Sequence, residues 1–114
     1  MSGRIGRALR CIPGYMAAAV GFAAGTDAAW YGPVSCAIEP ANVCNLRCPL
    51  CAAGAGLLGR PKGVMGAPEF ERLVRKLPGS LGTLYLWGQG EPFLAPGFLG
   101  MVRFAADRGF RTVT

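Results

Sequence analysis

Histidine is absent from this 114-residue sequence, and acidic residues are scarce, with six Asp and Glu against twelve Lys and Arg. The lack of histidine excludes Ser–His triads, Cys–His dyads, histidine general bases and every zinc site that requires imidazole. Charged residues make up only 16% of the chain and apolar residues 52%, which is too apolar for a disordered polypeptide. A chain of this length forms at most one domain with a modest core.

With histidine missing, five cysteines are the main candidates for metal ligands. Their odd number argues against a fully paired disulfide framework. Cys44, Cys48 and Cys51 lie within a stretch of eight residues, whereas Cys11 and Cys36 stand apart. Such a cluster suits a metal site in a reducing compartment better than it suits disulfides, so we expect a cytoplasmic protein.

Residues 1–32 are predicted to form a helical extension that precedes the domain. Three arginines come before an apolar stretch at 14–25, an order that also occurs in secretory signal peptides. We favour an amphipathic helix, because Ile5, Leu9 and Ile12 recur at helical spacing and a thiolate cluster belongs in the cytoplasm. The stretch is shorter than the roughly 20 apolar residues that span a bilayer, so no transmembrane segment is expected. We expect the arginines to be solvated, and no nucleic acid partner.

Residues 33–114 are predicted to form one α/β domain. Short apolar runs predict strands, and amphipathic stripes predict helices. The expected strands are 34–38, 83–87 and 110–114, and the expected helices are 68–77 and 96–108. This β-α-β-α-β order implies parallel strands joined by right-handed crossovers. We expect it to be the N-terminal portion of a partial TIM-like (β/α) barrel, because three strands cannot close a barrel and the last one reaches the final residue.

The clustered cysteines have the spacing C-x3-C-x2-C. Three thiolates on one loop can ligate three irons of a [4Fe–4S] cluster, which leaves the fourth iron open to a small molecule. Electron-transfer clusters use four cysteines, and the ferredoxin runs have other spacings. Structural zinc sites need four ligands, usually in paired C-x2-C knuckles. Cys36 is a conceivable fourth ligand, but its place in the middle of a predicted strand favours a small buried apolar residue.

The segment 38–51, IEPANVCNLRCPLC, resembles the cluster loop of radical S-adenosylmethionine (SAM) enzymes, most closely the branch with a C-terminal SPASM-type extension. That family shares C-x3-C-x-Φ-C, where Φ is an aromatic or large apolar residue, as Leu50 is here. The loop 88–92, GQGEP, is similar to the family's GGE motif, with Gln89 in place of the first glycine. Ala41 stands where many members have threonine. The resemblance covers residues 34–114.

The resemblance implies roles for five residues. Cys44, Cys48 and Cys51 would hold a [4Fe–4S] cluster, whose open iron would bind the amino and carboxylate groups of SAM. Gly90 and Glu91 would line the site for the SAM amino group. An electron from the cluster would cleave SAM to methionine and a 5′-deoxyadenosyl radical, which abstracts hydrogen from an unknown substrate, either a peptide or a small molecule. The implied partner is a reductant such as flavodoxin or ferredoxin, and no side chain is assigned a catalytic role.

Two other interpretations stay open at this stage. The same three cysteines fit a non-catalytic iron–sulfur or zinc-binding module. The net charge of +6 also fits a basic protein-interaction fragment without metal. Glu91 would then be an exposed loop acid. The run 60–63, RPKG, is expected to be a turn with solvated charges.

Overall fold

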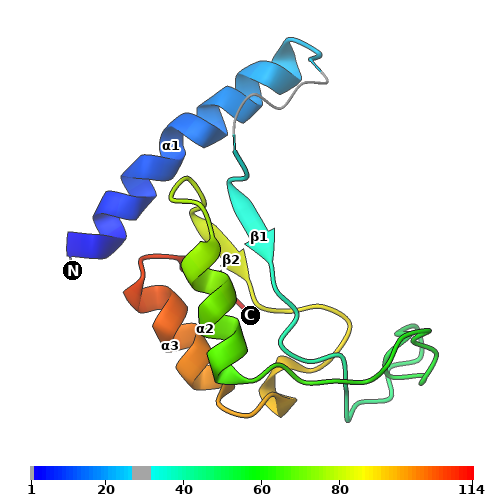
Figure 1. The fold of residues 1–114 in the computed structure, drawn as a ribbon. Coiled ribbons are helices and arrows are strands. Elements are labelled where there is room, and N and C mark those ends of the chain that lie inside the picture. The colour runs from blue at the N-terminus through cyan, green and yellow to red at the C-terminus, as the bar shows by residue number, and fades with distance from the viewer. Residues whose placement is uncertain (1, 27–31) are drawn as a thin grey trace.

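A computed structural model describes residues 2–26 and 32–114, with side chains from Ile12 onward in the first helix. The elements are α1 (Ser2–Ala23), β1 (Ser35–Ala37), α2 (Ala67–Lys76), β2 (Thr83–Tyr85), the 3-10 helix η1 (Pro92–Leu94), α3 (Phe98–Asp107) and β3 (Arg111–Val113) (Figure 1). The predicted β-α-β-α-β order is confirmed, and so is the N-terminal helix. Each strand is shorter than predicted, at three residues.

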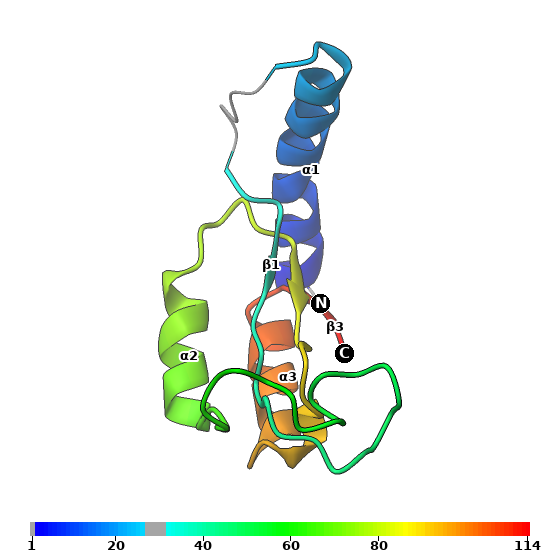
Figure 2. The same cartoon turned by 90° about the vertical axis from the view of Figure 1, so that its right-hand side faces the viewer.

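The three strands form one parallel sheet in the order β1-β2-β3, as predicted. Cys36 pairs with Leu84, and Leu84 in turn pairs with Thr112. One more backbone hydrogen bond extends each ladder, because Ile38 N donates to Tyr85 O and Leu86 N donates to Val113 O. Since the strand order advances in one direction, right-handed crossovers place both connecting helices on the same face of the sheet. α2 and α3 contact each other there (Figure 2).

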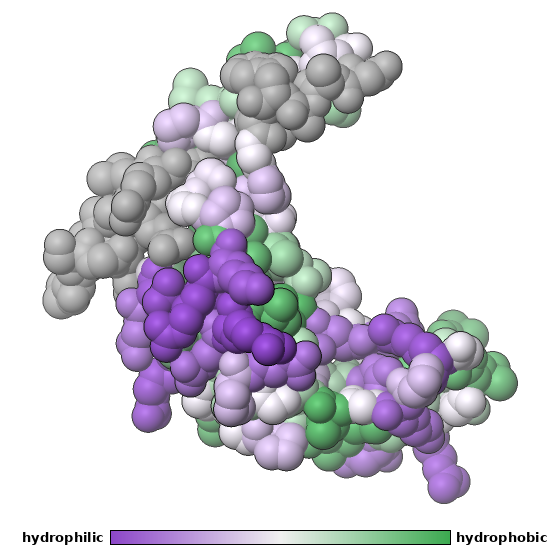
Figure 3. All heavy atoms as spheres, in the orientation of Figure 1, coloured by the Kyte–Doolittle hydropathy of each residue, from purple (hydrophilic) through white to green (hydrophobic). Residues whose placement is uncertain are grey.

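A single hydrophobic cluster joins the two helices to the sheet. Phe70 and Val74 of α2 and Met101 and Ala105 of α3 recur every four residues, so each pair lies on one side of its helix. They pack in the same cluster as Leu84 and other buried residues. The outward side of α2 is charged instead, and Figure 3 shows hydrophilic side chains gathered over this helix. The amphipathic pattern therefore determines which side of each helix faces the sheet.

Alternate residues of β2 lie on opposite faces of the sheet. Leu84 and Leu86 are fully buried beneath the helices. Tyr85 and Trp87 lie on the other face, where their rings meet edge to face with centroids 6.2 Å apart. Trp87 is half exposed there. The sheet is thus covered by α2 and α3 on one face only.

Helix α1 lies beside the start of the sheet. Gly14 lies against Val34, and the Tyr15 hydroxyl donates to Val34 O at 3.4 Å. Ile12, Met16 and Val20, which are four residues apart, are exposed. Among the residues that the structure describes, no helix combines the length and apolar character needed to cross a membrane. The predicted boundary at residue 32 follows residues 27–31, which lie outside the described part of the chain.

Truncating Met101 should destabilise the domain far more than truncating Leu99 on the same helix. Met101 is 1% exposed and Leu99 is 67% exposed. Met101→Ala leaves a cavity between α3 and the sheet and should cost about 2–5 kcal/mol. Leu99→Ala should change stability by less than about 0.5 kcal/mol. Urea unfolding of both variants measures the difference, and equal effects would show that α3 does not bury this side against the sheet.

Candidate metal centre

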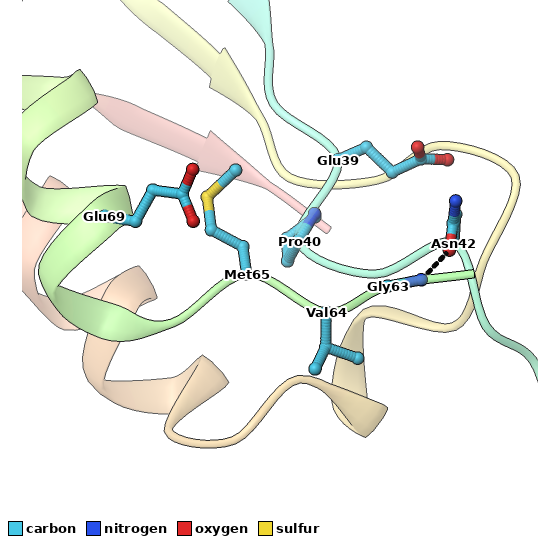
Figure 4. Close-up of a pocket in the computed structure, with 7 residues that line it drawn as sticks. All are labelled: Glu39, Pro40, Asn42, Gly63, Val64, Met65 and Glu69. Atoms are coloured by element: carbon cyan, nitrogen blue, oxygen red, sulfur yellow. Dashed lines mark hydrogen bonds between the residues drawn. The ribbon is translucent and has the colours of Figure 1, made fainter. Parts of the chain in front are cut away.

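The chain between β1 and α2 forms a long loop that is closed at its base. Asn42 makes three hydrogen bonds across this base: its N–H donates to Gly63 O at 3.1 Å, its Oδ1 accepts from Gly63 N at 2.6 Å, and its Nδ2 donates to Pro61 O at 2.7 Å. Met65 N donates to Pro40 O at 2.7 Å beside them. Figure 4 shows the bond from Gly63 to Asn42. Residues 43–62, which this base encloses, are called the cysteine loop below.

All three clustered cysteines lie on the cysteine loop as free thiols. Cys44 and Cys51 are half-buried, and Cys48 is exposed. Leu46 N lies 3.4 Å from Cys44 Sγ and donates a hydrogen bond to it. A turn brings Cys51 N to Cys48 O at 3.1 Å. Gly54 lies close to this turn, because a Cβ there would stand 2.9 Å from Cys48 N.

The structure places the three thiols on one loop but does not bring them together. Among the side chains that the structure describes, those of residues 12–26 and 32–114, no group of three His, Cys, Asp or Glu is arranged to hold a metal ion. The donor set itself fits an iron–sulfur cluster, since three unpaired thiols follow one another on one loop. Residues 52–56 form turns beside them, and Gly56 has a φ of +72°. The three candidate thiols thus lie on one short segment, and their arrangement there does not form a metal-binding group.

The loop 88–92 after β2 contacts the cysteine loop, so the structure brings the two predicted motifs together. Glu91 N donates to Val43 O at 2.8 Å. Cys51 Sγ lies 4.0 Å from Gln89 O. Gly90 allows this approach because a Cβ at this position would overlap the backbone carbonyl of Ala41. The segment is named here the GEP loop, after Gly90, Glu91 and Pro92.

Glu91 has a local structural partner in addition to its predicted role. Its Oε1 accepts a hydrogen bond from Phe93 N at 3.1 Å and so caps the short helix η1. The side chain is half-buried. A carboxylate has two oxygens and about four lone-pair sites, so capping leaves acceptor capacity for a ligand. Its predicted contact with the SAM amino group stays a prediction.

Cys36 is placed away from the cysteine loop. It lies in the middle of β1 and packs against the hydrophobic core, on the face that the helices cover. Its Sγ lies 3.6 Å from Ala37 O. This position agrees with the expectation that Cys36 is an apolar strand residue and not a fourth ligand. The side chain of Cys11 lies outside the described residues.

Sequence reasoning assigned no role to Glu39 or Asn42, although both are central to the geometry. Asn42 closes the base of the cysteine loop. Glu39 forms an ion pair with Arg60, a partner that the expectation of solvated charges at 60–63 did not include, although the Arg60 side chain is still 49% exposed. The available signal was two polar residues placed within five residues of the end of a predicted strand, where the C-terminal ends of parallel strands gather loop residues.

Comparisons with known proteins gave no match among protein-family models, curated proteins or solved structures. The function is therefore argued from the site.

Adding a methyl group at Gly90 should separate the two loops. Gly90→Ala places a Cβ against the Ala41 carbonyl and should lower the free energy of unfolding by about 1–3 kcal/mol, the usual cost of overpacking. Faster hydrogen exchange at the Glu91 amide should accompany the loss. Gly59→Ala is the matched control, because its Cβ would meet nothing within 4 Å. If both variants matched the wild type, the close approach of the loops would be disproved.

Proposed function

We propose that this chain is a radical SAM enzyme core. Cys44, Cys48 and Cys51 would hold a [4Fe–4S] cluster, and SAM would bind at its open iron beside Gly90 and Glu91. The observation that carries the proposal is the hydrogen bond from Glu91 N to Val43 O. It joins the cysteine loop to the GEP loop, and these two segments carry the sequence resemblance.

The arrangement of the sheet supports a partial TIM-like barrel as the setting. Successive β/α units of such a barrel place neighbouring strands in chain order and all helices on the outer face. β1, β2 and β3 have that order, and α2 and α3 lie on one face. Barrel active sites lie at the C-terminal ends of the strands, which is where both loops begin. The opposite face, with Tyr85 and half-exposed Trp87, would line the barrel interior.

The residues of the chain would bind and orient the cofactors. When bound, the reduced cluster supplies the electron that cleaves SAM to methionine and a 5′-deoxyadenosyl radical. The Glu91 carboxylate would accept a hydrogen bond from the SAM amino group, and the Gly90 carbonyl would be a second acceptor for it. Gly90 has no side chain, which allows the GEP loop to lie against the Ala41 backbone, and this close approach would let both loops contact one ligand. A flavodoxin or ferredoxin would deliver the electron, which agrees with a cytoplasmic location.

A non-catalytic iron–sulfur or zinc module is the second candidate. The observation that favours it is the hydrogen bond from Phe93 N to Glu91 Oε1, because capping η1 gives Glu91 a role that requires no SAM. A zinc module would need a fourth ligand, and Cys36, packed against the core, is poorly placed to supply one. The two candidates differ in their response to SAM.

Anaerobic reconstitution with iron and sulfide should load close to one [4Fe–4S] cluster per chain, and this loading should depend on three cysteines. Cys44→Ala, Cys48→Ala or Cys51→Ala should each abolish it, because two thiolates do not retain the cluster. Cys36→Ala should keep it, since Cys36 packs in the core. Iron and sulfide analysis with visible absorption measures the loading. A loss in Cys36→Ala as complete as in Cys48→Ala would contradict the three-cysteine site.

Adding SAM should change the electron paramagnetic resonance spectrum of the reduced cluster. Glu91→Gln should weaken the response without removing the cluster, while its amide oxygen can still accept from Phe93 N. A lost charged hydrogen bond of about 1.5–3 kcal/mol corresponds to roughly a tenfold to hundredfold drop in SAM affinity. SAM titrations at equal cluster loading measure the shift. A wild-type spectrum that is indifferent to millimolar SAM would favour the non-catalytic module.

A further inference from the structure

Glu39 connects three segments that are far apart in the sequence. It follows β1, and its Oε1 accepts from Gln89 N of the GEP loop at 2.7 Å. The same carboxylate binds the Arg60 guanidinium of the cysteine loop, at 2.8 Å from Oε1 and 2.6 Å from Oε2. The Glu39 side chain is 21% exposed and that of Arg60 is 49% exposed, so the ion pair is partly shielded from water. In Figure 4 the Glu39 side chain extends toward the segment that follows β2.

The backbone beside Glu39 leaves space for this carboxylate. A Cβ at Gly88 would overlap the Glu39 side chain, so only glycine allows Glu39 to lie there. The two glycines of the segment therefore have separate tasks. Gly88 admits Glu39, and Gly90 admits the Ala41 backbone.

Gln89 lies between Glu39 and Cys51, one of the three candidate metal ligands. Its N–H is held by Glu39, and its carbonyl oxygen lies 4.0 Å from Cys51 Sγ. An ionised acceptor makes the stronger kind of hydrogen bond, so Glu39 restricts where this residue sits. Arg60, near the C-terminal end of the cysteine loop, binds the same carboxylate. One carboxylate thus contacts both the GEP-loop residue that lies beside Cys51 and the part of the cysteine loop that carries Arg60.

We propose that Glu39 is a positioning residue which, together with Arg60, keeps Cys51 and the Gly90–Glu91 segment in one fixed relative placement. The purpose of that placement rests on the proposed function, in which both segments contact one cluster and its SAM. The contacts themselves are independent of any cofactor. Thiol reactivity can therefore test the positioning in the metal-free chain.

The cysteines provide three reporters within one molecule. Cys48 is exposed and serves as the reference for a freely reacting thiol. Cys51 is half-buried near Gln89 and reports whether the two loops stay together. Cys36 packs against the core and reports unfolding of the whole domain. Alkylation of the full metal-free chain by iodoacetamide, followed by peptide mass spectrometry, gives a rate for each.

Glu39→Ala should raise the alkylation rate of Cys51 relative to Cys48 by about three- to tenfold, as expected for the loss of one net hydrogen bond. Cys36 should stay protected. Arg60→Gln leaves the Glu39 carboxylate in place as the acceptor for Gln89 N, so it should give a smaller rise in the Cys51 rate. This variant replaces Glu39→Ala in the test if Glu39→Ala does not fold. Glu71→Gln is the matched control, because Glu71 forms a similar ion pair with Arg75 one turn away on α2, where the two side chains are 41% and 56% exposed. It should leave all three rates unchanged.

An unchanged Cys51 rate in Glu39→Ala would overturn the proposal, and so would a rise in Cys36 that parallels Cys51. A second measurement tests the purpose of the placement: at equal cluster loading, Glu39→Ala should weaken the spectral response to SAM, and an unaltered response would reject that purpose. Failure of the proposed function can be told apart from failure of the positioning role. If the proposed function fails, the wild type will load no cluster or show no spectral response to SAM, and the alkylation rates will still decide the role of Glu39.

Discussion

The close backbone approach of the GEP loop to the start of the cysteine loop is the constraint on which the rest of the site depends. Gly90 lies against Ala41, and Glu91 N donates to Val43 O at 2.8 Å. Parallel pairing of β1 with β2 makes the approach possible, because it directs the C-terminal ends of both strands to one edge of the sheet. The candidate ligands and the candidate SAM contacts become neighbours only through this register.

The same register is fixed by the hydrophobic core. Leu84 and Leu86 are buried against the helices, while Tyr85 and Trp87 lie on the opposite face. A slip of one residue would turn the leucines toward solvent, so burial selects a single pairing. The apolar positions of β2 therefore determine where Gly90 and Glu91 emerge, although neither leucine touches the site. The alternation of side chains along β2 thus determines both the packing of the hydrophobic core and the position of the candidate site.

The order of elements and the meeting of the two motif loops could be predicted from the sequence, because periodic apolar residues and parallel topology carry that information. The contact between Glu39 and Arg60 could not, since the residues are 21 positions apart across a segment without periodicity. Polar contacts across an irregular loop depend on how its base closes, here through Asn42 and Gly63. Strand lengths were overestimated because apolar character continues at Ile38 and Leu86, where each residue adds only one further backbone bond to its ladder.

The base of the cysteine loop is closed by hydrogen bonds, whereas its thiols do not converge, and this difference follows from the amino-acid composition of the loop. At the base and beside it, the Asn42 and Glu39 side chains form hydrogen bonds to backbone groups of other segments. Toward the tip, residues 52–56 are alanine and glycine, whose side chains are no larger than a methyl group and cannot fix a unique arrangement. The three thiols do not converge on a metal-binding group there. The free energy of metal binding to these thiols must include the cost of bringing them together, since metal binding and folding are coupled. Under the proposed function part of that ordering is already present, because Cys51 lies beside Gln89 of the GEP loop.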